Sequence, residues 1–158
     1  MTRRCGLIEK VELMFFLGQY EHSVDDKGRM TVPSRYRDLL SNGAYITQGF
    51  DNNLMVMTVE TFHKLSERIN AMSITDPLSR QLKRLIFSNA DRVDIDKSGR
   101  ILIPGFLRQT IQLNGSAFVV GMGGYFEIWE PEIWQKSDSE SKNNETNERR
   151  FAAFDLAF

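Results

Sequence analysis

The chain carries the stretch Asp25-Asp26-Lys27-Gly28-Arg29-Met30-Thr31-Val32-Pro33-Ser34-Arg35-Tyr36-Arg37, and further along it carries Asp96-Lys97-Ser98-Gly99-Arg100-Ile101-Leu102-Ile103-Pro104-Gly105-Phe106-Leu107-Arg108. Both stretches share one frame: an aspartate, two variable residues, glycine, arginine, three mostly apolar residues, proline, three further residues and arginine. Self-similarity at a fixed spacing is typical of a duplicated structural unit. The sequence therefore predicts a tandem duplication of a unit of about 70 residues.

Each copy of this frame predicts a β-hairpin followed by a short helix. A short strand, at residues 20–24 in the first copy and 92–95 in the second, leads into a turn whose glycine supplies a positive φ. A second strand leaves from the arginine. The proline then suits the first position of a helix, which we expect at residues 33–40 and 104–111.

The rest of each unit continues the mixed pattern. Thr58 and Asp76 are suitable N-caps for two amphipathic helices that connect the units. We expect the remaining strands at residues 44–48, 54–57, 117–121 and 125–129. The predicted class is therefore α+β, with two β-hairpin and short-helix units in tandem.

These elements divide the chain into five parts. They are an N-terminal extension, a first unit, connecting helices, a second unit and a flexible C-terminal tail, at residues 1–13, 14–62, 63–90, 91–136 and 137–158. The extension precedes a second methionine, Met14, and has no counterpart before the second unit. The tail begins with a stretch rich in Ser, Asn and Glu, which is typical of a loose segment or a frayed helix.

Composition excludes several classes of protein. The 158 residues are 41% hydrophobic and 26% charged, as in globular rather than disordered chains. One cysteine, Cys5, cannot form an intrachain disulfide, and two histidines do not complete a metal site. The longest apolar run, residues 13–17, is too short to cross a membrane. We expect a reduced cytoplasmic protein without a metal, a cofactor or a small-molecule substrate.

Positive charge is concentrated in the two copies of the frame. The net charge is only −1, so a basic surface must be local. Neither residues 27–37 nor residues 97–108 contain an acid. Exposed cations and turn amides bind phosphate, and arginine reads guanine edges in the major groove. We predict two DNA-contacting loops, with the candidate DNA-binding residues Lys27, Arg29, Arg37, Arg100 and Arg108. Asp25, Gly28, Pro33, Asp96, Gly99 and Pro104 are the residues expected to structure the loops.

Other interpretations of these residues remain open. A charged hairpin turn is often only solvated, and Arg37 or Arg108 on a short helix can simply pair with a carboxylate. A basic helix face formed by Arg80, Lys83 and Arg84 is more often solvated than a contact with DNA or another subunit.

Catalytic motifs are poorly supported. A His22/Asp25 pair is disfavoured because His22 has Val93 as its counterpart in the second unit. The stretch Gly121-Met122-Gly123-Gly124 lacks the spacing of a dinucleotide-binding loop and predicts a hairpin turn. We therefore do not expect an enzyme.

At Asp25-Asp26-Lys27-Gly28-Arg29, with Pro33 and Arg37, the sequence resembles the MraZ family of bacterial transcriptional regulators. Further stretches carry the same resemblance, namely Gly18-Gln19-Tyr20-Glu21-His22, Asp76-Pro77, Ser88-Asn89-Ala90, Gly99-Arg100-Ile101-Leu102-Ile103-Pro104 and Phe126-Glu127-Ile128-Trp129. The resemblance extends from Met14 to about Trp134.

The resemblance implies a duplicated AbrB-like (SpoVT-AbrB) fold, whose two units are related by a pseudo-twofold axis and form one β-barrel-like domain with peripheral helices. It implies functional pairs of Asp25 with Arg29 and of Asp96 with Arg100. Ser98 stands where the first copy has Lys27, so we expect the second loop to be the less cationic.

The resemblance also implies partners. They are double-stranded DNA with repeated promoter boxes and further copies of the chain in a ring-shaped homo-oligomer. Such a protein would lie in the cytoplasm at the nucleoid and would act on its own division and cell-wall gene cluster, usually as a repressor. The main alternative is an AbrB-like antitoxin or protein-interaction module, although most of those carry one unit and a toxin-binding tail.

Overall fold

A computed structural model describes residues 15–142 and 144–154 of the chain, and the expected extension at residues 1–13 lies outside the described residues. The strands are β1 (Gln19–Ser23), β2 (Arg29–Thr31), β3 (Ala44–Gln48), β4 (Leu54–Thr58), β5 (Asp91–Val93), β6 (Arg100–Leu102), β7 (Ser116–Gly121) and β8 (Phe126–Trp129). The helices are α2 (Ser34–Arg37), the 3-10 helix η1 (Asp38–Leu40), α3 (Val59–Asn70), α4 (Pro77–Phe87), α5 (Gly105–Thr110), α6 (Pro131–Ser141) and α7 (Asn144–Phe151). None of the described helices is long and apolar enough to cross a membrane.

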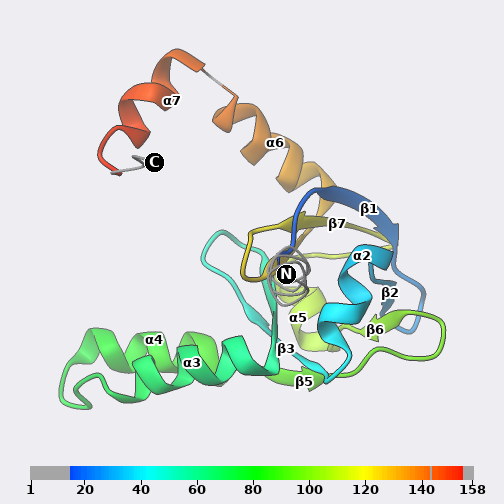
Figure 1. Cartoon of the computed structure of the whole chain (residues 1–158), viewed down its shortest axis with the longest axis horizontal. Helices are drawn as coiled ribbons and strands as arrows, with labels where there is room; N and C mark the ends of the chain where they lie inside the picture. Colours follow the sequence, from blue (N-terminus) through cyan, green and yellow to red (C-terminus); the bar gives the residue numbers. More distant parts are fainter. Residues whose placement is uncertain (1–14, 143, 155–158) are drawn as a thin grey trace, which may run out of the picture.

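The two units interlock through their strands (Figure 1). One antiparallel sheet has the strand order β1-β7-β8-β4-β3-β5, and β2 pairs with β6 in a separate two-stranded ribbon. Strands of the first unit pair with strands of the second in β1–β7, β4–β8 and β2–β6. The α+β class is confirmed. The sheet is not closed into a barrel, because β1 and β5 form its two edges.

The sequence predicts that the two strands around each turn pair with each other, and this prediction is wrong. Val24 and Met30 form a single bridge, whereas the ladders of β1 and β2 are made with β7 and β6. This exchange places Met30 opposite Ile101, and both side chains are buried. A repeated pattern indicates which residues form strands. Because both copies have the same apolar positions, a strand finds a similar partner in its own unit and in the other one. The pattern alone therefore could not decide between pairing within a unit and pairing across units.

The main core lies between the sheet, the ribbon and the short helices. It contains side chains of all three, among them Ile46, Val119, Ile101, Tyr36 and Leu107. Pro33 and Pro104 lie one residue before α2 and α5 and have extended backbones, with ψ of 136° and 139°. The predicted helices are thus present, with each proline as the capping residue instead of the first helical one.

Helices α3 and α4 form a hairpin that projects from the sheet (Figure 1). The predicted caps are confirmed, because Thr58 Oγ1 accepts a hydrogen bond from the amide of Thr61 at 3.1 Å and Asp76 Oδ1 accepts one from that of Leu78 at 2.9 Å. A second core cluster joins this hairpin to the outer face of the sheet, with Met55, Met57, Phe62, Ile69 and Ile86 as its buried members.

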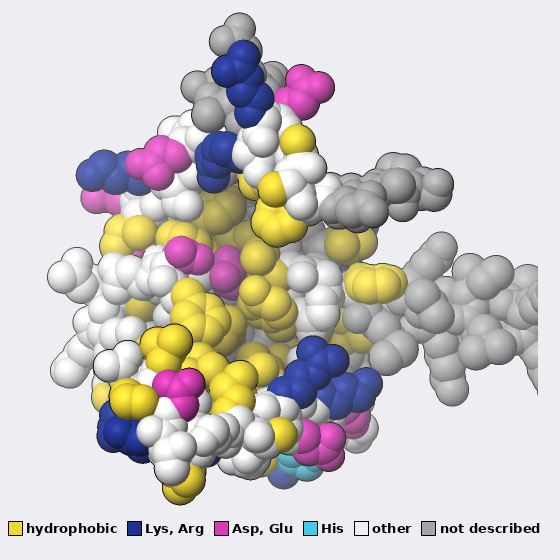
Figure 2. Space-filling view, turned by 90° about the vertical axis from the view of Figure 1, so that its left-hand side faces the viewer, with side chains coloured by type: hydrophobic (Ala, Val, Ile, Leu, Met, Phe, Trp, Pro, Cys, Tyr) yellow, Lys and Arg dark blue, Asp and Glu magenta, His cyan; other side chains and the backbone are white. Residues whose placement is uncertain are grey.

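The outer face of the sheet is hollowed beside this hairpin. Figure 2 shows hydrophobic side chains gathered on this side of the molecule, above the helical hairpin. The hollow has a volume of about 380 Å³, and its lining includes Phe50, Met55, Leu65, Ile69 and Tyr125. At the opposite end of the sheet, Trp134 of α6 stacks on Phe118 with ring centroids 5.7 Å apart.

Candidate nucleic-acid interface

The two copies of the frame form two turns of the same geometry. The amide of Gly28 donates to the carbonyl of Asp25 at 3.0 Å, and the amide of Gly99 donates to that of Asp96 at 3.0 Å. The glycines have φ of +87° and +77°, a left-handed conformation that side chains with a β-carbon rarely adopt. Each glycine is therefore required by the backbone of its turn, as the sequence predicts.

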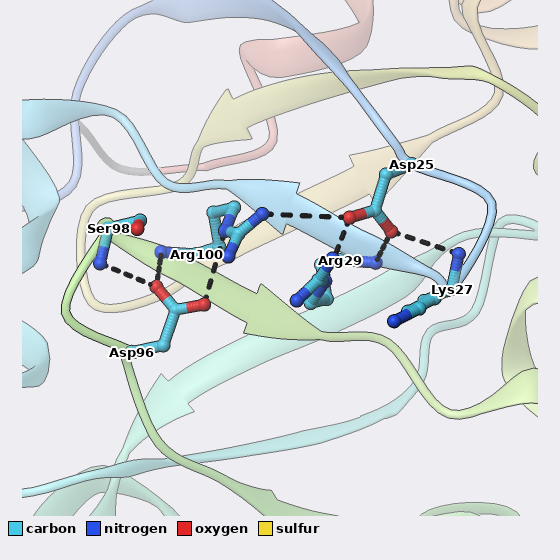
Figure 3. Close-up of polar contacts among 6 residues, drawn as sticks. All are labelled: Asp25, Lys27, Arg29, Asp96, Ser98 and Arg100. Atoms are coloured by element: carbon cyan, nitrogen blue, oxygen red, sulfur yellow. Dashed lines mark hydrogen bonds and ion pairs between the residues drawn. The ribbon is translucent and has the colours of Figure 1, made fainter.

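Each turn is braced by its first aspartate (Figure 3). The Oδ1 atom of Asp25 accepts hydrogen bonds from the amides of Lys27 at 3.0 Å and Arg29 at 2.9 Å. The corresponding atom of Asp96 accepts from the amides of Ser98 at 2.9 Å and Arg100 at 3.0 Å. One carboxylate oxygen thus closes the turn and leaves the other free to bind a side chain.

That second oxygen holds the arginine. The Nε atom of Arg29 donates to Oδ2 of Asp25 at 2.8 Å, and Nε of Arg100 donates to Oδ2 of Asp96 at 3.1 Å. These donors, led by the backbone amide of the arginine in each pair, hold the pKa of both carboxyls below the ordinary value. The arginines are consequently oriented by ionised partners, while their side chains stay 35% and 30% exposed.

The ribbon brings the two arginines to one surface. In the β2–β6 register, Arg29 lies opposite Leu102 and Arg100 lies opposite Thr31. Since side chains alternate between the faces of a strand, these four residues share the outer face of the ribbon. Arg100 also reaches the first unit, because its Nη1 atom lies 3.6 Å from Oδ2 of Asp25. The two loops therefore form one continuous site.

The turns are also locked to each other through the backbone and two further arginines. The amide of Val32 donates to the carbonyl of Gly99 at 2.9 Å, and the amide of Ile103 donates to that of Gly28 at 2.9 Å. A β-carbon at Gly99 would lie 2.5 Å from Cζ of Arg37. In the same way, a β-carbon at Gly28 would overlap the guanidinium of Arg108. Each arginine thus lies over the glycine of the other unit.

Arg37 and Arg108 are held there by hydrogen bonds within the protein. Nε of Arg37 donates to the carbonyl of Val32 at 3.0 Å, and Nε of Arg108 donates to that of Ile103 at 3.0 Å. The sequence prediction grouped both arginines with the DNA-binding residues. These bonds position the turns, and the contact of both arginines with DNA stays a prediction.

The remaining predicted residues occupy different places. Lys27 is exposed in the first turn, and Pro33 and Pro104 start the short helices after the ribbon. The turn positions between aspartate and glycine hold Asp26 and Lys27 in the first loop and a lysine and a serine in the second. Because Asp26 offsets the charge of Lys27, the second turn is not the less cationic of the two.

One buried titratable group, Glu127, was not singled out by the sequence pattern, and the partly buried His22 was considered only as a disfavoured catalytic partner of Asp25. Glu127, on the outer face of the sheet, is only 6% exposed, and its Oε1 atom accepts a hydrogen bond from Nε1 of Trp129 at 3.1 Å. Burial raises the pKa of this carboxyl. Burial, followed by the charge of Arg37, lowers the pKa of His22. Glu127 stands in an apolar strand, and a lone acid in such a strand is the signal that marks it.

Comparison with known proteins supplies the family. The model of the family described as "MraZ protein, putative antitoxin-like" matches residues 15–85 and again residues 86–155. The chain belongs to the MraZ family. The two successive matches confirm the predicted tandem duplication.

Curated relatives agree with this assignment. A protein of Herpetosiphon aurantiacus is 45% identical over 120 residues, which cover 76% of this chain and 84% of the relative. A protein of Roseiflexus castenholzii is 44% identical over 120 residues, which again cover 76% of this chain and 84% of the relative. One of Dictyoglomus turgidum is 42% identical over 125 residues, which cover 79% of this chain and 86% of the relative. All three carry the name "Transcriptional regulator MraZ".

Proposed function

We propose that this MraZ-family chain is a sequence-specific DNA-binding transcriptional regulator. The observation that carries the proposal is that Arg29 and Arg100 lie on the same face of the β2–β6 ribbon, each held by its own aspartate. The names of the relatives support the same function.

The geometry suits recognition of a duplex. The major groove admits a two-stranded β-ribbon, and arginine binds guanine through O6 and N7. Each aspartate binds its own arginine at Nε and does not occupy the terminal nitrogens, although Nη1 of Arg100 also lies 3.6 Å from Asp25. Arg29 and Arg100 therefore read base edges or grip phosphates, Lys27 adds a phosphate contact, and Arg37 and Arg108 position the turns. An electrostatic contribution of this kind falls as salt rises.

Assembly and regulation form the second part of the proposal. The chain forms a ring-shaped homo-oligomer, binds repeated boxes in its own promoter and represses its division and cell-wall gene cluster, in the cytoplasm at the nucleoid. One chain contributes few DNA contacts, so linked subunits would gain affinity through their high effective concentration. The apolar hollow beside α3 and α4 supports self-association, because Phe50 at its lining is 66% exposed and exposed apolar side chains at a hollow are typical of contact surfaces.

No catalytic role is proposed. Asp25 and Asp96 are both engaged by turn amides and arginines, which leaves neither free to act as a general base. Among the described residues, no group of three or more His, Cys, Asp and Glu side chains could hold a metal ion.

The proposal is tested with DNA from upstream of the chain's own gene. Footprinting defines the bound boxes, and duplexes are then made with half a helical turn or a full turn, about 5 or 10 bp, inserted between boxes. A phased array loses much more affinity with the half-turn insertion than with the full-turn insertion. Equal affinity for both duplexes would contradict phased binding by linked subunits, and the absence of any footprint would contradict the function itself.

An antitoxin-like interaction module is the second candidate, favoured by the description of the matched family. It predicts a toxin that co-purifies with the chain in stoichiometric amount. Co-purification of such a toxin together with no footprint on the upstream DNA would favour this candidate over the regulator.

A further inference from the structure

The outer face of the ribbon carries two side chains besides its arginines. Thr31 and Leu102 each follow their arginine by two positions, so they occupy equivalent places in the two units. The register sets Leu102 beside Arg29 and Thr31 beside Arg100. On the opposite face, Met30 and Ile101 are buried in the core. The outer face is thus a compact array in which each arginine has one uncharged neighbour from the other unit.

These two neighbours break the pseudo-twofold symmetry of the site. Thr31 carries a hydroxyl, whereas Leu102 is wholly apolar and 54% exposed. A single exposed leucine on a protein surface is ordinary. Leu102, however, stands directly opposite Arg29, which is proposed to contact DNA. The other outward-facing side chain of its three-residue strand is the partly exposed Arg100. Any duplex that reaches both arginines must also cover Leu102.

The spacing limits what Leu102 can contact. Residues directly opposite each other in an antiparallel pair have Cα atoms about 4.5–5.5 Å apart, and successive bases of one DNA strand are about 3.4 Å apart. A side chain opposite Arg29 therefore reaches the base pair one or two steps from the pair that Arg29 contacts. In the major groove, the apolar feature of a base is the C5-methyl group of thymine. A threonine offers it one methyl group but also a hydroxyl that bonds to several bases, whereas a leucine offers only apolar atoms.

We propose that Leu102 is a specificity-determining residue that recognises a thymine methyl group next to the base pair contacted by Arg29. Thr31 tolerates several bases at the equivalent place next to Arg100. The two half-sites bound by one chain are consequently unlike, with a thymine preference in only one of them. This inference rests on the proposed DNA-binding function.

The test uses deoxyuridine, which differs from thymine only by the missing methyl group. In a footprinted duplex, each base pair is replaced in turn by T·A or by U·A, and the dissociation constant is measured for the full chain. The wild-type chain prefers T·A over U·A by about fourfold at one position of one half-site, as expected for burial of one methyl group. Leu102→Ser abolishes that preference, whereas the matched variant Thr31→Ser keeps it.

A swapped variant, Thr31→Leu with Leu102→Ser, moves the preference into the other half-site. Thermal unfolding of each variant checks that the ribbon is intact. Binding of the wild-type chain without any preference for T·A over U·A, or an unchanged preference in Leu102→Ser, would overturn the inference and leave the DNA-binding function standing. If the wild-type chain binds none of the duplexes, the proposed function and this inference both fail.

Discussion

Asp25 reaches across the ribbon to Arg100 of the other unit, with Oδ2 3.6 Å from Nη1, in addition to its 2.8 Å contact with Arg29. Asp96, in contrast, pairs with Arg100 of its own loop. Among the described residues, no ion pair joins Asp96 to Arg29. The two loops are therefore coupled through one carboxylate, and the two aspartates are not equivalent despite their identical place in the repeat.

This asymmetry predicts that Asp25→Asn impairs DNA recognition more than Asp96→Asn. Asparagine retains an oxygen for the turn amides, so both variants keep their turns, but Asp25→Asn removes the ionised partner of two arginines at once. The quantity to measure is the ratio of affinities for the footprinted duplex and for unrelated DNA, because the loss of an acid raises non-specific affinity. Equal ratios for the two variants would contradict the coupling.

The packing of Arg108 over Gly28 predicts an unequal cost of glycine substitutions. Gly28→Ala and Gly115→Ala both force a residue with a β-carbon into positive φ, at about 1–2 kcal/mol. Gly115 has no atom within 4 Å of the added carbon, whereas at Gly28 the carbon displaces the guanidinium. Loss of the Arg108 hydrogen bond should cost about 1 kcal/mol more. Chemical unfolding of both variants measures the difference, and equal losses would argue against the packing.

Substitutions of Arg108 and of Arg29 should differ in their effect on stability, because Arg108 supports a turn and Arg29 is proposed to contact DNA. Arg108→Met keeps the aliphatic stem but leaves the carbonyl of Ile103 without its 3.0 Å donor, so it lowers the free energy of unfolding by about 1 kcal/mol. Arg29→Met removes a partly exposed group and leaves thermal unfolding close to that of the wild type. Melting curves that rank the two variants in the opposite order would show that Arg108 does not position the turn.

Burial of Glu127 predicts a pH-dependent stability. Its folded pKa is raised, first by burial, so the wild-type fold loses stability as the pH rises from the unfolded value of about 4.3 through the folded pKa. Glu127→Gln keeps an acceptor for Trp129 and removes the charge. The variant is therefore more stable than the wild type at pH 7, and the gain shrinks toward pH 4. A variant that is less stable at pH 7, or equally changed at every pH, would contradict this.

Much of the fold is predictable from the sequence because the repeated frame marks each turn. The glycines with positive φ, the bracing role of Asp25 and Asp96, and the caps Thr58 and Asp76 all follow from local residue chemistry. These features depend on residues within four positions of each other, where sequence spacing and spatial distance are nearly the same.

Long-range relationships were not predictable in this way. A duplicated sequence offers β2 a similar apolar partner in either unit. In the exchanged pairing, Met30 lies opposite Ile101 in the core, and backbone hydrogen bonds from Val32 to Gly99 and from Ile103 to Gly28 join the units. The same exchange carries Arg37 over Gly99 and Arg108 over Gly28. The sequence prediction therefore treated these two arginines as equivalent to Arg29 and Arg100, because it had no means of knowing that they face the other unit's turn.

The most direct test of the DNA-binding site compares two double variants for binding to the footprinted duplex by fluorescence anisotropy over a range of salt concentrations. Arg29→Gln with Arg100→Gln removes the two arginines of the ribbon, and Arg80→Gln with Arg84→Gln removes the same charge from α4. We expect the ribbon variant to melt like the wild type but to bind about tenfold more weakly or worse. Its logarithmic salt slope should flatten by about 0.9 for each phosphate that is no longer neutralised. The α4 variant should bind as the wild type does. Wild-type affinity in the ribbon variant, or equally weakened binding in both variants, would contradict the claim that Arg29 and Arg100 form the DNA-binding site.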